Sequence, residues 1–272
     1  MKTLTIILTL AAAAVLIAAC APKKKVLVLY YSQTANTKAL AEAIQAKLGA
    51  DMEEIVALQP YDGNFKETID RCMVEREQGV LPDIQPLKSK IADYDLIFIG
   101  YPVWFGTYAP PVAQLLKDAD FSGKKIVPFC TFGSGGLQSS AMDMEKALPN
   151  AEILPGYGVR AARMEAMPAE VDQFLKANGY IKGDFVKPEP FPAEHPVSEA
   201  EAALFDEAVG DYPMMHAKAK AVAARTVPGG TEYLFTAEQL PMQDAPTIGM
   251  PEMKVYVLDL DGKKAEFTQV IR

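Results

Sequence analysis

Three short apolar runs constrain the fold of this chain more than any other feature. They are Val26–Tyr30, Leu96–Gly100 and Lys125–Cys130, and they contain almost only aliphatic, aromatic and other apolar residues. A strand with one face in water would show a polar residue at every second position, so these runs indicate strands buried on both faces. A helical pattern follows each run. This alternation predicts an α/β fold in which helices cover both faces of a parallel sheet.

Each of these strands leads into a loop of unusual composition. Ser32–Thr37 carries hydroxyl and amide side chains, Pro102–Gly106 holds the only tryptophan of the chain, and Thr131–Gly136 holds three glycines. Parallel strands end at a common edge of their sheet, and ligands of open α/β sheets bind at that edge. We therefore expect the three loops to form one site.

The first loop has the chemistry of an anion site. It opens a helix, whose free N–H groups and positive dipole end attract negative charge. The hydroxyls of Ser32, Thr34 and Thr37 add short hydrogen-bond donors. The loop has neither the glycine–lysine motif of nucleotide P-loops nor the glycine fingerprint of dinucleotide folds, which favours a phosphate monoester. An ordinary capped turn between strand and helix is the alternative.

The second and third loops suit a planar ligand. Trp104 lies among aromatic residues in a loop punctuated by Pro102 and Gly106, and an aromatic ring offers such a ligand a large stacking surface. The glycines of the third loop indicate tight turns, exposed N–H groups or both. For the second loop, the alternative is a surface loop packed by its own aromatic side chains.

Together the three loops resemble the flavodoxin-like family over residues 25–178. The pattern Ser-x-Thr-x-Asn-Thr after a buried strand is similar to the phosphate loop of that family. The resemblance implies a doubly wound parallel sheet of order 2-1-3-4-5 and FMN as the cofactor. The family usually has glycine where this chain has Ala35, and an alanine there weakens the site if its φ is positive.

The resemblance also assigns residues to parts of the cofactor by position. Carried over in this way, the phosphate would be held by Ser32, Gln33, Thr34, Ala35, Asn36 and Thr37. One side of the isoalloxazine would be covered by Pro102, Val103, Trp104, Phe105 and Gly106, with Trp104 as the stacking ring. Another edge would be covered by Thr131, Phe132, Gly133, Ser134, Gly135 and Gly136.

The chain begins with the pattern of an export signal. Lys2 precedes the apolar stretch Leu4–Ala19, which ends in small residues before Cys20 and is shorter than a bilayer span of about 20 residues. This junction resembles the lipobox of bacterial lipoproteins, which implies that Cys20 becomes the acylated N-terminus. We therefore expect a cell-envelope protein that is lipid-anchored to a membrane on its extracytoplasmic side. An ordinary cleaved signal peptide or a short membrane anchor is the alternative.

The last third of the chain has a different pattern. Lys187–Pro196 is proline-rich and predicts an extended linker. Ser198 and Glu201 form a capping box that opens a helix, and two hairpins with alternating patterns follow. This α+β part has a first hairpin similar to that of cystatins, but it lacks their usual Gln-Val-Val-Ala-Gly loop. We interpret it as an adaptor or packing domain. The expected divisions are residues 1–19 (signal peptide), 20–24 (tether), 25–180 (flavodoxin-like), 181–197 (linker) and 198–272 (α+β).

Charge and cysteine usage argue against several classes of partner. The formal net charge of −8 disfavours nucleic acid and anionic lipid, which attract basic surfaces. Cys72 falls in a helical segment and Cys130 ends a predicted central strand, which favours buried free thiols over a disulfide. The two histidines are far apart in sequence and no C-x-x-C motif occurs, so we expect no metal site.

Three functions fit these observations. The leading hypothesis is a membrane-tethered, monomeric FMN protein that exchanges electrons with a redox partner protein or a small quinone-type acceptor. The second is an FMN-dependent NAD(P)H:quinone or nitro reductase. The third is a flavin-free lipoprotein that binds protein or glycan. No acid–base pair or nucleophile stands out in the sequence, so we assign no catalytic side chain.

Overall fold

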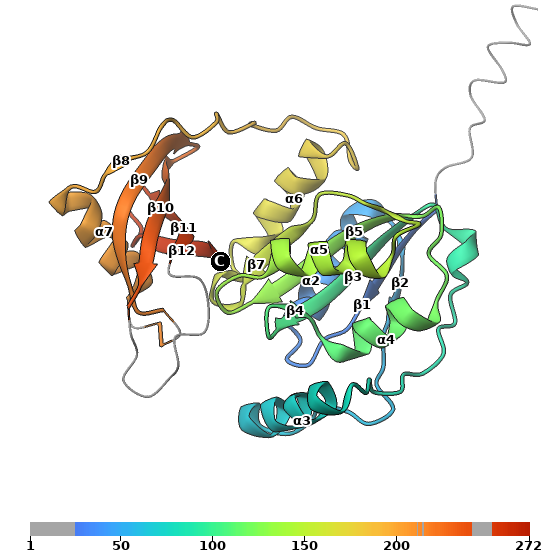
Figure 1. Cartoon of the computed structure of the whole chain (residues 1–272). Helices are drawn as coiled ribbons and strands as arrows, with labels where there is room; N and C mark the ends of the chain where they lie inside the picture. Colours follow the sequence, from blue (N-terminus) through green and yellow to red (C-terminus); the bar gives the residue numbers. More distant parts are fainter. Residues whose placement is uncertain (1–24, 211, 214, 241–251) are drawn as a thin grey trace, which may run out of the picture.

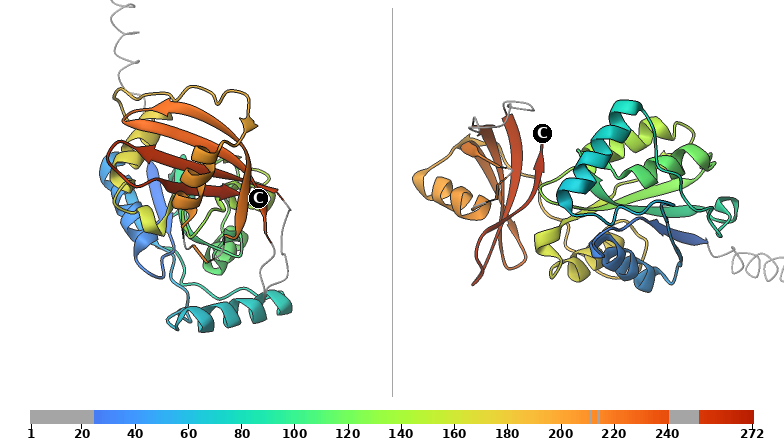
Figure 2. Two further views of the ribbon diagram at one scale, coloured as in Figure 1. Left: turned by 90° about the vertical axis from the view of Figure 1, so that its left-hand side faces the viewer. Right: turned by 90° about the horizontal axis from the view of Figure 1, so that it is seen from below.

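The computed structural model describes residues 25–210, 212–213, 215–240 and 252–272 (Figure 1). The predicted signal peptide, tether and lipidation site at Cys20 lie outside the described residues. The described chain forms a helix-covered parallel sheet and, after an extended segment, an antiparallel sheet with one helix. The two parts lie side by side, as the right view in Figure 2 also shows.

The first sheet is parallel and has the predicted strand order. Its strands are β1 (Val26–Tyr30), β2 (Asp51–Glu54), β3 (Leu96–Trp104), β5 (Lys125–Phe132), β6 (Glu152–Ile153) and β7 (Tyr157–Arg160). The order is β2-β1-β3-β5-β6, and β4 (Thr107–Tyr108) is only a short antiparallel partner of β3. The parallel strands therefore follow the order 2-1-3-4-5. β6 pairs with the start of β5 and β7 with its end, so these two short strands share the last position.

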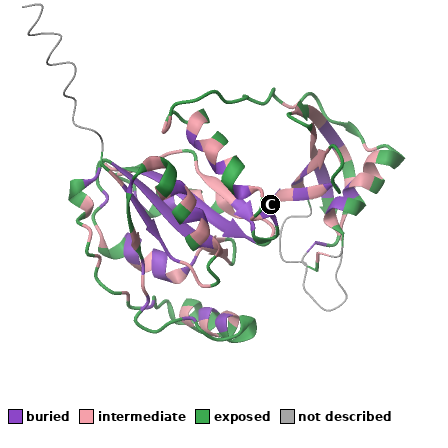
Figure 3. Ribbon diagram, turned by 180° about the vertical axis from the view of Figure 1, so that it is seen from behind, coloured by how far each residue is buried: buried purple, intermediate pink, exposed green. Residues whose placement is uncertain are grey.

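Helices cover both faces of the parallel sheet. Those packed on one face are α2 (Asn36–Leu48) and α6 (Met167–Ala177), and those on the other are α4 (Pro110–Asp118) and α5 (Leu137–Ala147). In β1, Leu27 and Leu29 enter one core whereas Val28 and Tyr30 enter the other, and none of the four is more than 4% exposed. The apolar runs therefore do mark strands buried on both faces, and Figure 3 shows these strands as the most continuously buried part of the molecule.

One helix stands apart from this arrangement. α3 (Phe65–Gln78) buries only Thr68 and Cys72, and a capping box of Asn64 and Glu67 fixes its start. α3 lies beside the sheet rather than upon it (Figure 1), and most of its apolar side chains are therefore exposed.

Two predicted elements differ in the structure. Ile55 and Val56 favour a strand over residues 51–57, but β2 ends at Glu54. The sequence also favours a helix that ends over residues 88–92, but the structure has a short 3-10 turn there, Ile91–Asp93. The cause of the second difference is a competing hydrogen-bond acceptor, since the backbone N–H groups of Lys88 and Ser89 donate to the carboxylate of Glu53, at 2.6 and 2.8 Å.

The second sheet is antiparallel and contains both predicted hairpins. Its strands are β8 (His195–Pro196), β9 (Ala217–Val227), β10 (Gly230–Gln239), β11 (Glu252–Leu260) and β12 (Glu266–Ile271), in the order β12-β11-β10-β9-β8. α7 (Glu199–Val209) begins at the predicted capping box of Ser198 and Glu201 and packs Phe205 into the core of this sheet. The last residues of the predicted linker form β8, which pairs with β9.

The state of the two cysteines bears on a further expectation. Cys72 and Cys130 are buried and unpaired, which confirms the prediction of free thiols. No helix in the described part of the chain combines the length and the apolar character that crossing a bilayer requires.

Candidate functional site

The structure brings the three unusual loops together at the carboxyl edge of the parallel sheet. The buried hydroxyls of Thr37 and Thr131 share a hydrogen bond of 2.8 Å, which joins the first loop to the third. Ser139, in the first turn of α5, donates to the carbonyl oxygen of Gly106 at 2.6 Å, which joins the second loop to the helix that follows the third. The carboxyl edge therefore carries one connected cluster of loops.

The start of α2 is open to an external anion. α3 and α7 each begin with a capping box that includes a glutamate, but α2 has neither a side-chain cap nor an acidic residue in its first turn. The first N–H groups of any α-helix have no partner within it. Of these, the N–H of Lys38 donates to Ser32 Oγ at 3.2 Å. The remaining donors and the dipole of α2 favour negative charge at this position.

The side chains of the first loop divide into two groups. Gln33 Nε2 donates to the carbonyl oxygen of Tyr61 at 2.7 Å and to Thr68 Oγ1 at 2.9 Å, so it ties the loop to α3. Thr37 is 1% exposed and is held by Thr131. Thr34 and Ala35 are exposed. Gln33 and Thr37 therefore shape the loop, whereas the tip around Thr34 is left exposed at its surface.

Trp104 lies in an aromatic cluster. β3 and β5 stay paired up to Pro102 and Thr131, so residues predicted as loop continue the strands, and Trp104 ends β3. Its ring meets those of Tyr31 and Tyr61 edge to face, with centroids 5.8 and 5.2 Å away. Burial is the main cause that raises the pKa of both tyrosines well above the ordinary value, so they stay neutral. The cluster fixes the Trp104 ring beside the first loop.

The cluster around Tyr61 includes residues that the sequence did not single out. The guanidinium carbon of Arg71 lies 3.7 Å from the centre of the Tyr61 ring, and the Tyr61 hydroxyl donates to Glu75 at 2.6 Å. Arg71 also pairs with Glu75 at 2.8 Å. These residues belong to α3, and the spacing of Arg71 and Glu75 on one helix face was the only signal that could have indicated them.

Phe105 and Gly106 form a strained turn at the end of this hairpin. They are the two residues between Trp104 and Thr107, and both have positive φ, of 52° and 81°. A two-residue hairpin loop with positive φ at both positions is the type I′ turn, which asparagine and glycine favour. Phe105 nevertheless occupies the first position with 48% of its surface exposed, and the guanidinium carbon of Arg76 lies 5.1 Å from its ring centre. Strain of this kind concentrates at functional sites.

One buried hydroxyl in the same hairpin has no partner. Thr107 Oγ1 is the only buried side-chain nitrogen or oxygen without a hydrogen bond among the described residues. Thr107 pairs directly with Trp104, so both side chains lie on the same face of the hairpin. An unpaired buried hydroxyl costs about 1–3 kcal/mol. A polar group of a ligand or an ordered water would therefore be stabilised here.

The third loop is built around glycines for identifiable reasons. Gly136 has φ 120°, and a Cβ there would lie 2.5 Å from Val103 Cγ1. The carbonyl oxygen of Gly136 accepts a hydrogen bond from the hydroxyl of Ser140, near the start of α5. Gly133 and Ser134 are partly turned towards the second sheet, because the N–H of Val270 donates to the carbonyl oxygen of Ser134 at 2.7 Å. The sequence had assigned this loop to the cofactor alone, and nothing in it indicated the contact with β12.

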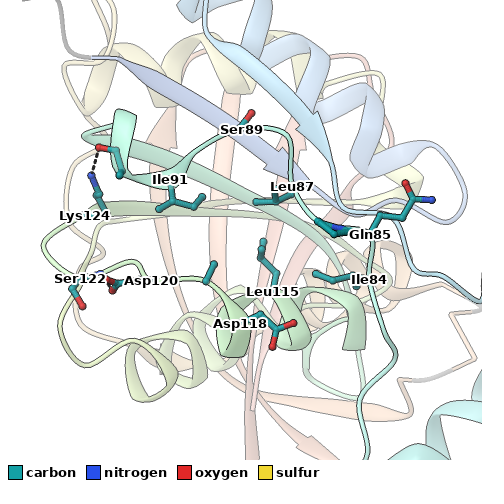
Figure 4. A pocket seen from close by; sticks show the side chains of 13 residues that line it. Ile84, Gln85, Leu87, Ser89, Ile91, Leu115, Asp118, Asp120, Ser122 and Lys124 are labelled. Atoms are coloured by element: carbon teal, nitrogen blue, oxygen red, sulfur yellow. Dashed lines mark hydrogen bonds between the residues drawn. The ribbon is translucent and has the colours of Figure 1, made fainter.

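A cavity in the described part of the chain lies away from the three loops. It measures about 690 Å³ and is lined by residues such as Leu87, Ile91, Leu115 and Lys124 (Figure 4). Lys124 immediately precedes β5, and Ile91 lies a few residues before β3. The cavity therefore opens near the amino ends of these strands, opposite the cluster of loops. The candidate site rests on the chemistry of its loops and not on the depth of a pocket.

The family profile described as flavodoxin matches residues 25–172. Three flavoproteins are among the similar solved structures. A candidate flavoprotein from Bacteroides eggerthii shares 30% identity, with coverage of 55% of this chain and 97% of its own and a TM-score of 0.48. A candidate flavoprotein from Bacteroides uniformis shares 24%, covering 55% and 98%, with a TM-score of 0.49. A Lactobacillus acidophilus flavoprotein solved in complex with FMN shares 26%, covering 50% and 93%, with a TM-score of 0.46.

Proposed function

Because the chain belongs to the flavodoxin family over residues 25–172, we propose that it binds FMN at the carboxyl edge of its parallel sheet and transfers electrons. The observation that carries this proposal is the junction of the three loops, which the Thr37–Thr131 hydrogen bond fixes beside the open start of α2. The donor set fits a phosphate monoester, since it consists of neutral hydroxyls and backbone N–H groups at a helix start.

The residues of the three loops would have distinct roles. The tip of the first loop, at Ser32 and Thr34, would hold the phosphate, and Trp104 and Phe105 would cover the ring system. The third loop would approach another edge of the ring. FMN itself supplies the redox chemistry when it is bound, whereas the protein orients it and excludes water. The Tyr31–Tyr61–Trp104 cluster keeps the ring-binding surface rigid, because each of its rings is packed against another.

We also propose an extracytoplasmic location. The apolar segment before Cys20 supports export and a lipid anchor. The acceptor would be a redox partner protein or a small quinone-type compound, and the protein would act as a monomer. For the second sheet, we propose a packing or adaptor role rather than the protease inhibition suggested by the cystatin-like hairpin.

Absorbance is the first test of FMN binding. The protein isolated from its own envelope should show the absorbance band of flavin at about 450 nm. The apoprotein should quench the fluorescence of added FMN with one FMN bound per chain. Substituting Thr34 by valine should weaken binding, whereas the same change at the exposed Thr226 of β9 should not. A colourless protein that leaves FMN fluorescence unchanged would exclude this function and favour a flavin-free binding module.

The reduction potential tests the electron-transfer part. The acidic protein, with net charge −8, and an aromatic cover both disfavour added negative charge on the flavin. The bound flavin should therefore have a lower potential than free FMN in a redox titration. A value at or above that of free FMN would contradict this proposal.

A second candidate function is an FMN-dependent NAD(P)H:quinone or nitro reductase. The observation in its favour is the exposed ring of Phe105 next to Arg76, which leaves an aromatic surface and a cation open beside the candidate site. Oxidation of NADH or NADPH by the holoprotein with a quinone acceptor would support this function. Electron exchange with one-electron carriers alone would favour the first candidate function, electron transfer.

A further inference from the structure

The glycine-rich loop of the candidate FMN site is in direct contact with the second sheet. The N–H of Val270, in β12, donates to the carbonyl oxygen of Ser134. A Cβ on Gly135 would collide with the backbone oxygen of Val270. A backbone oxygen in a paired strand has little freedom to move, so glycine at position 135 is required by the approach of β12 and not only by a cofactor.

Arg160 connects the same loop to the same strand. Its Nε donates to the carbonyl oxygen of Gly133 at 2.9 Å, and its Nη1 donates to the carbonyl oxygen of Phe267 at 2.8 Å. Its guanidinium carbon lies 3.4 Å from the centre of the Phe267 ring and 5.4 Å from that of Tyr212. A planar guanidinium can donate along two edges while it stacks on a ring, and a lysine ammonium cannot.

A second buried arginine strengthens this contact. Arg163 pairs with Glu170, in α6, and with Glu266, in β12, both at 2.7 Å. Arg160 and Arg163 are only 8% and 6% exposed. Truncating Glu170 or Glu266 is costly, because it removes a partner from the buried charge of Arg163. The docking of β12 therefore depends on the two arginines that end β7 and follow it.

We infer that Arg160 is a positioning residue for the FMN site, which fixes the glycine-rich loop from the side of the second sheet and couples the docking of that sheet to FMN binding. The inference rests on the proposed function, because it concerns the same loop. By linkage, if docking orders the loop for FMN, then FMN must stabilise docking by the same factor. The second sheet is in this sense a structural part of the flavin site.

The first measurement is the affinity of the full-length apoprotein for FMN. Arg160→Met should weaken binding about tenfold, within the usual range of coupling between sites. Arg160→Lys, which keeps the charge but can serve fewer acceptors, should give an intermediate value. Arg225→Met is the matched control, since Arg225 also donates to a backbone carbonyl oxygen, that of Glu189, at 2.9 Å and lies 4.2 Å from the Phe191 ring centre, but away from the glycine-rich loop. It should leave FMN affinity unchanged.

The second measurement is hydrogen exchange at the amide of Val270. β12 is an edge strand, and this N–H points outward to Ser134, so its protection reports docking and not the folding of the second sheet. In the wild-type protein, saturating FMN should slow its exchange about tenfold. In the Arg160→Met variant, exchange should be faster, and FMN should have little effect on it. The visible circular dichroism of bound FMN should also change in this variant.

The outcomes separate this inference from the proposed function. A wild-type protein that binds no FMN would overturn the proposed function and this inference with it. Two results would overturn the inference alone, provided that the wild-type protein binds FMN. One is an unchanged FMN affinity in Arg160→Met, and the other is exchange at the Val270 amide that is insensitive to FMN. If Arg160→Met does not fold, the affinity of Arg160→Lys and the exchange of the wild-type amide give the same decision.

Discussion

Two residues with unusual backbone conformations stand out at the candidate site. Ala35 and Phe105 are the only non-glycine residues with positive φ in the described part of the chain, and they lie in the first and second loops. A residue with a Cβ pays for this conformation, and such strain persists where the surroundings impose it. Both outliers belong to loops that the sequence assigned to the cofactor, and the positive φ of Ala35 meets the condition under which alanine at that position is expected to weaken the site.

Relief of the strain at Ala35 should stabilise the protein. The left-handed conformation costs a residue with a Cβ about 1–2 kcal/mol, and glycine offsets about 0.5–1 kcal/mol of this through its greater chain entropy. Ala35→Gly should therefore raise the free energy of unfolding in urea by about 0.5–1 kcal/mol without weakening FMN binding. Ala39→Gly, four residues later inside α2, should instead destabilise by about 1 kcal/mol. Equal destabilisation by both changes would contradict this explanation.

The strain at Phe105 should separate stability from binding. Asparagine accepts positive φ more readily, so Phe105→Asn should raise the free energy of unfolding of the apoprotein by about 1 kcal/mol, even after loss of the contact with Arg76. The same change removes the exposed ring and should weaken FMN binding. Urea unfolding and FMN titration of one preparation measure both effects. A variant that is less stable than the wild type would show that the ring is retained for packing instead.

At the level of elements, the sequence predicted best what depends on local pattern. The apolar runs became the central strands, and the capping box at Ser198 began α7. Contacts between distant segments had no such pattern. Arg160 reads as an ordinary polar residue at a strand end, and its partners Gly133 and Phe267 lie 27 and 107 positions away. The glycines of the third loop were therefore assigned to the ligand, although Gly135 also makes room for β12.

The hydrogen bond between Thr37 and Thr131 should couple α2 to β5 energetically. Each of Thr37→Val and Thr131→Val leaves a buried hydroxyl without its partner, which costs about 1–3 kcal/mol. The double variant leaves neither and should cost clearly less than the sum, with a coupling energy of about 1 kcal/mol or more. A double-mutant cycle from urea unfolding measures it. Thr226→Val, at an exposed position of β9, is the control and should stay within about 0.5 kcal/mol of the wild type. Additive effects would show that the two hydroxyls act independently.

For the whole molecule, the buried thiols and phenols predict loss of stability at alkaline pH. Burial raises the pKa of Cys72 to about 11 and that of Tyr30 to about 12, and it also raises that of Cys130. In the unfolded chain, the pKa of a cysteine is about 8.5 and that of a tyrosine is about 10. The folded state therefore keeps protons that the unfolded state has lost, so stability is full below about pH 8.5 and declines as pH rises towards 11 and 12.

Urea unfolding as a function of pH tests this sign. The free energy of unfolding should fall by about 2 kcal/mol or more between pH 8 and pH 10.5. Cys72→Ala should make the decline shallower, because one of the contributing groups is removed. A flat profile, or stability that increases with pH, would contradict the predicted alkaline loss of stability.

The segment between the two sheets has a consequence for how their contact works. Residues 178–194 form neither helix nor strand, and they join α6 to β8 as one covalent connection (Figure 1). A tether of this kind holds two surfaces at an effective concentration in the millimolar range. The few hydrogen bonds and two arginines of the contact then suffice, because docking is intramolecular and independent of dilution. A single cut in residues 178–194 would change this, since the same surfaces would then have to find each other in solution. A protease acting there would release the second sheet from the glycine-rich loop.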